Sequence, residues 1–227
     1  MIRCNIGEEG QKMLQEPSTT NMIYISELND RINYYLIIII TLVITYVIIR
    51  LTKRRGIISI ENRNHSTLIE IIWTIIPGLI LIIIGIPSIK LLYGEEEIPE
   101  ITIKIKGIQW YWNYEIEGKT IDSYTIDTTE EGQLRLLEVD KRIKIPILTP
   151  VRLLITGEDV IHSYAIPSLG IKTDSIPGRI NSTTVTILKE GTYYGQCSEL
   201  CGASHYKMSI VIEGVTKKEY LEWLIQE

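Results

Sequence analysis

The stretch Ile101-Thr102-Ile103-Lys104-Ile105-Lys106 alternates apolar and polar residues with a period of two. This period is typical of a half-buried strand, in which one face packs into a core and the other meets solvent. Trp110-Tyr111-Trp112 continues the same pattern a few residues later. This part of the chain is therefore predicted to form a β sheet.

Further short runs of β-type residues follow, separated by Gly, Pro, Asn and Asp. Several short strands at this spacing are typical of a sandwich or barrel. We therefore predict an all-β domain over residues 94–227, closed by a short helix at 217–225. The expected additional strands are 134–139, 151–156, 183–188 and 209–213.

Two uncharged, Ile-rich runs precede this domain, at residues 34–49 and 71–89. A helix needs roughly 20 apolar residues to cross a bilayer. Both runs approach this length when Arg50 and Lys90 extend their charged ends to the interface. Buried helices of a soluble protein would show a polar face at the helical period, which these runs lack. A transmembrane hairpin is thus predicted over 34–93, with helices at about 34–51 and 69–92.

The connection between the two runs is basic, with Glu61 as its one acidic residue. By the positive-inside rule it faces the cytoplasm or the mitochondrial matrix, and the β domain faces the opposite compartment. No small-residue cleavage site follows the first run, so we do not expect a cleavable signal peptide. We predict no particular structure for residues 1–33, which include Cys4. The basic residues are Arg50, Lys53, Arg54, Arg55 and Arg63.

The net charge of −5 is uneven, because 21 acidic and 14 basic residues lie between Gly94 and Glu227. An acidic domain argues against a nucleic-acid partner, which requires a basic face. It favours a basic protein partner instead.

The most informative segment is 196–208, in which two thiols, an imidazole and a thioether fall within twelve residues. Another of the three histidines, His162, lies upstream. Soft sulfur ligands combined with imidazole select copper, and a weak axial Met is the mark of copper electron-transfer sites. The segment therefore predicts a copper site with the donors Cys197, Cys201, His205 and Met208.

A one-copper site of this type needs a single Cys, whereas this segment has two. Both thiolates could bridge two ions, with His162 and His205 each terminating one of them. Met208 and the backbone carbonyl of Glu199 would complete the shell. One electron shared over two ions changes each bond length little, which suits an electron relay.

Two other interpretations of the same residues remain open. Cys197 and Cys201 could form a disulfide outside the membrane. Zinc could take the two Cys and two His, but that site would not need Met208.

These residues resemble the cytochrome c oxidase subunit II family, whose binuclear copper centre is called CuA. The resemblance runs from about Asn33 to Glu213. Its strongest blocks are EIIWTIIP at 70–77, QWYW at 109–112, LRLLEVD at 134–140, PSLG at 167–170 with PGR at 177–179, and the loop 197–208.

The resemblance implies a cupredoxin-like Greek-key barrel on a helical hairpin, docked onto the haem-bearing subunit I. It implies that the chain accepts electrons from reduced cytochrome c and passes them to haem, for oxygen reduction coupled to proton pumping. The Glu199 carboxylate would also bind Mg²⁺ shared with subunit I, a hard ligand suited to that ion. The implied copper ligands are His162, Cys197, Glu199 through its carbonyl, Cys201, His205 and Met208.

Further roles follow from the same resemblance. Trp110 matches the aromatic residue that receives the electron, and Glu70 matches the carboxylate at a proton-channel mouth. The implied location is the mitochondrial inner membrane, with the β domain in the intermembrane space; a bacterial plasma membrane is less favoured. A docking face for basic cytochrome c is expected from acidic residues such as Glu115, Asp140, Glu158 and Asp159.

Three positions depart from the family pattern, and none is a ligand. Ile108 stands where His is usual, Tyr164 where Trp is common, and Ser209 where Pro is common. Quinol oxidase subunits lack the copper ligands, and a nitrous-oxide-reductase-like enzyme needs a large further domain. A purely structural or assembly role is the remaining rival from another class.

Overall fold

The computed structural model describes residues 6–7, 10–53, 66–93, 98–127 and 134–226. The chain divides into two units. One consists of residues 25–94 and contains the two long helices. The other consists of residues 1–24 and 95–227 and contains the β domain. Residues 54–65, which make up most of the predicted basic connection, lie outside the described residues.

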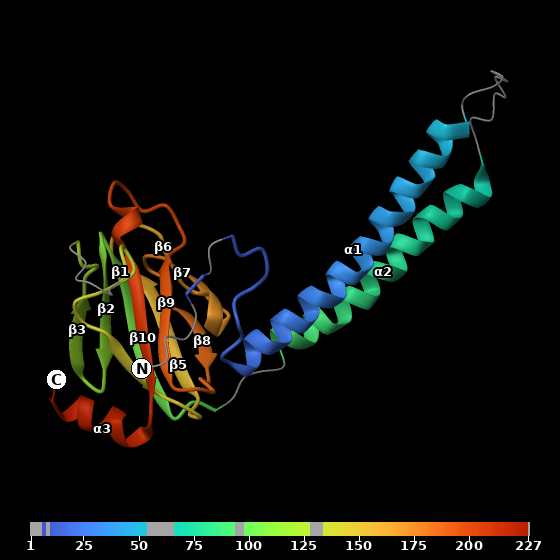
Figure 1. Ribbon diagram of the computed structural model, residues 1–227. Helices are drawn as coiled ribbons and strands as arrows, with labels where there is room; N and C mark the ends of the chain where they lie inside the picture. Colours follow the sequence, from blue (N-terminus) through green and yellow to red (C-terminus); the bar gives the residue numbers. More distant parts are fainter. Residues whose placement is uncertain (1–5, 8–9, 54–65, 94–97, 128–133, 227) are drawn as a thin grey trace. The chain divides into compact units, whose positions relative to one another are not determined.

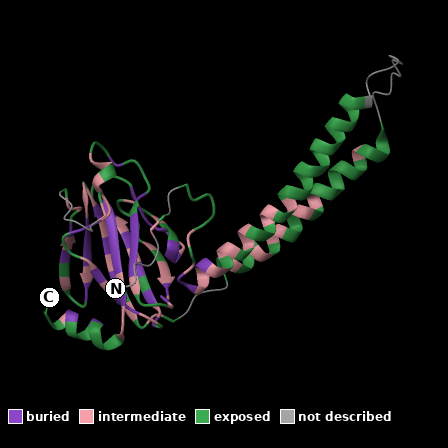
Figure 2. Ribbon diagram, viewed as in Figure 1, coloured by how far each residue is buried: buried purple, intermediate pink, exposed green. Residues whose placement is uncertain are grey.

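Helices α1 (Thr20–Lys53) and α2 (Thr67–Tyr93) lie side by side in the first of these units (Figure 1). Both are long and apolar enough to cross a membrane, and none of the residues in their most apolar windows is buried. Figure 2 shows these helices as largely exposed. Exposed apolar side chains over windows of this length suit a lipid environment, where backbone groups are satisfied within the helix.

Helix α1 begins well before the apolar run that predicted it. The Thr19 hydroxyl accepts a hydrogen bond from the N–H of Met22 at 3.0 Å, which caps the free N-terminal end of the helix. The Thr19 hydroxyl donates in turn to the Leu169 carbonyl at 2.9 Å, within the β domain. The position at which α1 begins is therefore determined by this cap and not by the apolar run.

The β domain is a sandwich of two five-stranded sheets (Figure 1). In the first sheet the order is β3-β2-β1-β5-β8, and in the second it is β4-β10-β9-β6-β7. The first contains β1 (Ile101–Ile108), β2 (Tyr111–Ile116), β3 (Lys119–Ser123), β5 (Val151–Gly157) and β8 (Asn181–Val185). The second contains β4 (Ile143–Pro146), β6 (His162–Ile166), β7 (Ile171–Ser175), β9 (Gly191–Cys197) and β10 (Ser209–Val215). Short helices η1 (Pro167–Leu169), η2 (His205–Lys207) and α3 (Lys217–Gln226) complete the domain.

The core lies between the two sheets, whose strands are strongly buried (Figure 2). Ile103 and Ile105 of β1 are each 1% exposed, whereas the intervening Lys104 is not buried. The alternation in residues 101–106 is thus confirmed, as is the all-β class of the domain.

The predicted strand at 134–139 is wrong. The N–H groups of Leu137 and Glu138 both bond to the Leu134 carbonyl at 3.2 Å, and Leu136 has a φ of 58°. The backbone therefore turns here, and only Val139 forms an isolated bridge to another segment. The run at 183–188 is also misplaced, since its strand ends at Val185.

Candidate metal centre

The predicted ligands come together at one end of the sandwich. His162 begins β6 and Cys197 ends β9, and these strands pair antiparallel with Tyr164 opposite Cys197. The remaining ligands lie on the connection between β9 and β10. The N–H of Cys197 donates to the Met208 carbonyl at 2.9 Å, which closes this connection into a loop. We call residues 197–208 the ligand loop.

Three buried side chains form the centre of the cluster. The ligating atoms of His162, Cys197 and Cys201 all lie within 4.8 Å of one another. The two Sγ atoms are 4.0 Å apart, and both cysteines are free. The thiols are thus adjacent without being bridged, as a shared metal pair requires.

The other donors surround the thiols. The Nδ1 atom of His205 lies 3.6 Å from Cys201 Sγ, and Met208 Sδ lies 3.9 Å from the same sulfur. The backbone carbonyl of Glu199 lies 3.3 Å from Cys197 Sγ. All six predicted copper ligands therefore face one small volume.

The His162 ring indicates that this volume suits a metal. The imidazole is fully buried, and its Nε2 lies 2.8 Å from Asp159 Oδ1. Its Nδ1 has no hydrogen-bond partner in the described part of the chain. A buried polar atom without a partner is costly unless a ligand completes it. An imidazole with one nitrogen on a carboxylate and the other free is the usual arrangement of a metal-binding histidine.

The two thiols differ in acidity. Burial raises the pKa of Cys197, but the His162 imidazole and the backbone of Ser163 outweigh it and lower the pKa to about 7. Burial and the neighbouring Cys197 raise the pKa of Cys201 to about 12. The two adjacent thiols therefore do not both ionise readily, and a bound cation would favour the loss of both protons.

The carboxyl and imidazole beside the thiols support each other. Burial raises the pKa of Asp159, but hydrogen bonds from His162 and from two backbone N–H groups lower it overall. Burial lowers the pKa of His162, while Cys197 and Asp159 raise it overall. Asp159 is therefore an anion next to the imidazole.

Trp110 lies against the ligand loop. Its Nε1 donates to the Cys201 carbonyl at 3.2 Å, and the side-chain amide of Gln109 donates to the same oxygen at 2.9 Å. Gly202 permits this approach, because a Cβ at this position would lie 3.2 Å from Trp110 Cζ2. The turn between β1 and β2 thereby joins the first sheet to the ligand loop of the second.

The remaining predicted residues lie elsewhere or face away. The Glu199 side chain is exposed, so its carboxylate is directed differently from its carbonyl. Glu70 lies in the first turn of α2, where its carboxylate accepts the N–H of Ser66 at 3.2 Å. This contact caps the helix and does not test a role in proton uptake.

Three of the four acidic residues expected to dock a partner already have hydrogen-bond or ion-pair partners within the domain. Asp159 points to His162, Glu115 pairs with Lys104 at 3.2 Å, and Asp140 accepts the N–H of Tyr124 at 2.7 Å. Within the described residues, the Glu158 side chain makes no hydrogen bond or ion pair. Sequence reasoning missed the inward role of Asp159, although its spacing of three residues from His162 was a usable signal.

The departures from the family pattern fit their surroundings. Tyr164 is buried edge-on against Trp112 at 4.9 Å, and its hydroxyl lies 3.2 Å from that of Tyr114. Ser209 is buried, and its hydroxyl donates to the Leu136 carbonyl at 2.7 Å. Ile108 ends β1 half-buried. None of the three displaces a ligand.

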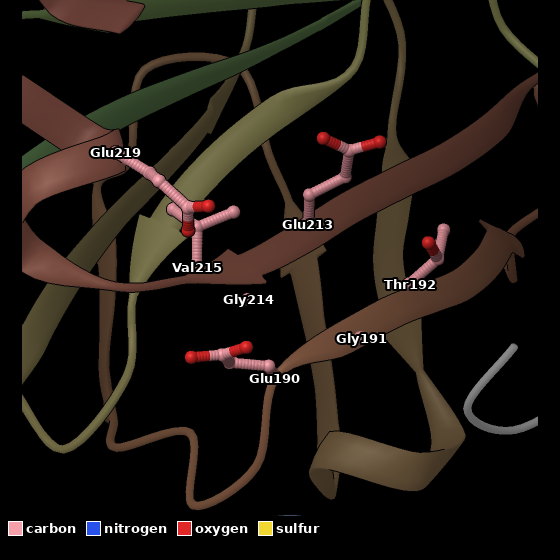
Figure 3. A pocket seen from close by; sticks show the side chains of 7 residues that line it. All are labelled: Glu190, Gly191, Thr192, Glu213, Gly214, Val215 and Glu219. Atoms are coloured by element: carbon pink, nitrogen blue, oxygen red, sulfur yellow. The ribbon is translucent and has the colours of Figure 1, made fainter. Parts of the chain in front are cut away.

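A separate cavity of about 190 Å³ is lined by the residues in Figure 3. It lies where β9 begins and β10 ends, whereas the ligand loop joins the other ends of these strands. Its acidic side chains have structural partners, since Glu213 binds Arg142 at 2.8 Å and Glu219 accepts the N–H of Thr216 at 3.1 Å. The carboxylates of Glu213 and Glu219 are therefore engaged in structural contacts. The cavity is lined by Glu190, Gly191, Thr192, Glu213, Gly214, Val215 and Glu219.

Comparison with known proteins identifies the family. The model for the periplasmic domain of cytochrome c oxidase subunit II matches residues 101–215, and the model for its transmembrane domain matches residues 7–91. The chain belongs to the cytochrome c oxidase subunit II family. Cytochrome c oxidase subunit 2 of Mycosarcoma maydis is 48% identical over 215 residues, covering 88% of this chain and 84% of that one. The subunit 2 of Zea mays is 44% identical and covers 97% and 91%.

Solved structures agree with this family. The periplasmic domain of subunit II (CoxB) of Bradyrhizobium japonicum is 42% identical, with a TM-score of 0.55, covering 58% of this chain and 96% of that one. A subunit II domain in a mixed disulfide with a thioredoxin-like protein is 41% identical, with a TM-score of 0.52, covering 60% and 95%. This member of the family is thus a subunit II of cytochrome c oxidase, with two helices long and apolar enough to cross a membrane. Its fungal and plant relatives indicate the mitochondrial inner membrane.

Proposed function

We propose that this subunit II holds two copper ions in the cluster at the ligand loop. The observation that carries the proposal is the pair of unbridged, buried thiols 4.0 Å apart, next to the unpartnered Nδ1 of His162. Two soft sulfur donors, imidazoles and a thioether favour copper over zinc. The proposed ligands are His162, Cys197, Glu199 through its carbonyl, Cys201, His205 and Met208.

When bound, a copper pair supplies a one-electron carrier whose ligands hardly move on transfer. The residues of the chain provide the route to it. Trp110 is half-exposed and bonds directly to the carbonyl of Cys201, so it links the surface to a ligand. Reduced cytochrome c would deliver its electron at Trp110, and the centre would pass it to haem in subunit I.

Two further roles belong to the same proposal. The exposed carboxylate of Glu199 would hold Mg²⁺ where subunit I meets the ligand loop, because carboxylate oxygens suit that ion. Glu70, at the start of α2, would serve proton uptake on the matrix side. The β domain would then face the intermembrane space.

Copper can bind only when both thiols are reduced. The Sγ atoms of Cys197 and Cys201 are close enough for a disulfide to form after a small movement. A related subunit II domain has been captured in a mixed disulfide with a thioredoxin-like protein. A thiol-reducing partner would therefore prepare this centre before copper arrives.

The test uses the purified oxidase that contains the full chain. Electron paramagnetic resonance should show one unpaired spin shared equally by two copper nuclei. A Cys197→Ser variant should lose this pattern, while Cys4→Ser should retain it. A one-copper pattern in the wild type, or an unchanged pattern in Cys197→Ser, would refute the proposed ligand set.

A further inference from the structure

The Asp159 carboxylate joins two segments that carry different parts of the centre. Its Oδ1 lies 2.8 Å from Nε2 of His162, at the start of β6. Its Oδ2 accepts the backbone N–H of Gln109 at 2.7 Å, in the turn between β1 and β2. The two oxygens of one side chain therefore connect the second sheet to the first.

The connection continues to the ligand loop. The side chains of Gln109 and Trp110 both donate to the carbonyl of Cys201. A chain of hydrogen bonds thus runs from His162 through Asp159 and Gln109 to Cys201. Trp110 is held at the end of this chain, against the backbone of a proposed ligand.

We propose that Asp159 is a positioning residue that directs His162 Nδ1 to the metal pair and holds the Gln109–Trp110 turn against Cys201. This inference rests on the proposed function. A neutral imidazole carries one N–H, and a carboxylate beside Nε2 fixes the proton there, which leaves the Nδ1 lone pair for a metal. The buried and unpartnered Nδ1 of His162 agrees with this assignment.

The alternative role for Asp159 is a surface charge for cytochrome c. Asp159 is exposed in part, with 29% of its side chain accessible, but both of its oxygens accept hydrogen bonds from the centre. The neighbouring Glu158 is likewise exposed, but it makes no such contact among the described residues. A comparison of Asp159 with Glu158 can therefore distinguish a positioning role from a docking role.

The first test compares Asp159→Asn with Glu158→Gln in the intact oxidase. Each substitution removes one negative charge, but only Asp159→Asn would place an NH₂ group against the N–H of His162 or of Gln109. We expect Asp159→Asn to alter the copper resonance pattern, to raise the midpoint potential, and to lose copper to a chelator about 10- to 100-fold more readily. Glu158→Gln should keep the wild-type pattern, potential and copper retention.

A second variant tests the other half of the connection. Gln109→Leu removes the side-chain bond to Cys201 but retains the backbone N–H that binds Asp159. It should keep the wild-type copper spectrum while slowing electron acceptance from cytochrome c. This variant remains informative if Asp159→Asn prevents assembly.

The outcomes distinguish the two proposals. A wild-type two-copper pattern, together with an unchanged pattern, potential and copper retention in Asp159→Asn, would overturn the positioning role alone. The same is true if Glu158→Gln and Asp159→Asn change these properties equally. An unchanged electron-acceptance rate in Gln109→Leu would overturn the part that concerns Trp110. Absence of a two-copper pattern in the wild type would overturn the proposed function itself.

Discussion

The indole Nε1 of Trp110 donates a hydrogen bond to the carbonyl oxygen of Cys201 over 3.2 Å. This bond joins a half-exposed aromatic ring directly to a residue of the proposed copper centre. It provides a hydrogen-bonded route from the surface around Trp110 into the ligand loop.

Replacing Trp110 should slow electron acceptance without disturbing the copper centre. We expect Trp110→Ala to reduce the rate of oxidation of cytochrome c by roughly tenfold or more, equivalent to about 1.4 kcal/mol in the barrier. Trp110→Phe, which keeps a ring but lacks the N–H, should lie between Ala and the wild type. Stopped-flow kinetics measure the rates, and the copper spectrum should stay unchanged. Wild-type kinetics in Trp110→Ala would end the role assigned to this residue.

The contact between Trp110 and the ligand loop should also be sensitive to Gly202. A Cβ there would crowd Trp110 at 3.2 Å, and the φ of 120° already disfavours a side chain. Gly202→Ala should therefore slow electron acceptance several-fold and cost roughly 1–2 kcal/mol in stability. Gly118→Ala is the matched control, because its φ is also positive at 80° but nothing lies within 4 Å. Equal kinetics in the two variants would show that crowding of Trp110 is unimportant.

Substitution of Met208 should change the potential of the centre more than its fold. Met208 is 1% exposed, and Leu has a similar volume, so Met208→Leu should cost less than about 1.5 kcal/mol. Loss of a weak axial thioether that stabilises the oxidised form should raise the midpoint potential. Redox titration tests this, with the buried Met22→Leu, outside the centre, as control. An unchanged or lower potential in Met208→Leu would contradict the axial role.

The stability of the first turn of α3 should depend on pH, because this turn is capped by the carboxylate of Glu219. Hydrogen bonds from the backbone and hydroxyl of Thr216 lower the pKa of Glu219 below its ordinary 4.5. A lowered folded-state pKa stabilises the helix fully above about pH 4.5, and this contribution is lost as the pH falls through the lowered value. Hydrogen exchange in α3 should therefore be faster in Glu219→Gln than in the wild type at neutral pH. The difference should vanish in acid, and a difference that persists there would exclude the carboxylate as its source.

Much of the architecture follows from local patterns in the sequence. Uncharged runs long enough to cross a bilayer predicted both long helices, because lipid accepts only apolar side chains over that length. The period of two in residues 101–106 predicted β1, because side chains alternate across a strand. The types of donor in the ligand loop predicted a soft metal, since they lie close together in the chain itself.

Other features were decided only by the tertiary structure. Residues 134–139 have the composition of a strand, but Leu136 adopts a left-handed conformation and the segment turns. The beginning of α1 depends on Thr19 and its bond to Leu169, which are distant in sequence. Composition alone does not predict the turn at residues 134–139 or the start of α1, because both depend on the segments that pack against them in the folded domain.

The same division applies to the centre. The sequence determined which residues could ligate copper, because ligand chemistry belongs to the side chains. Only the pairing of β6 with β9 placed His162 beside the thiols. The contact between Asp159 and His162 is local, but only the packing of the two sheets placed Gln109 between Asp159 and Cys201. Those hydrogen bonds require a few ångströms of proximity between residues that are distant in the sequence.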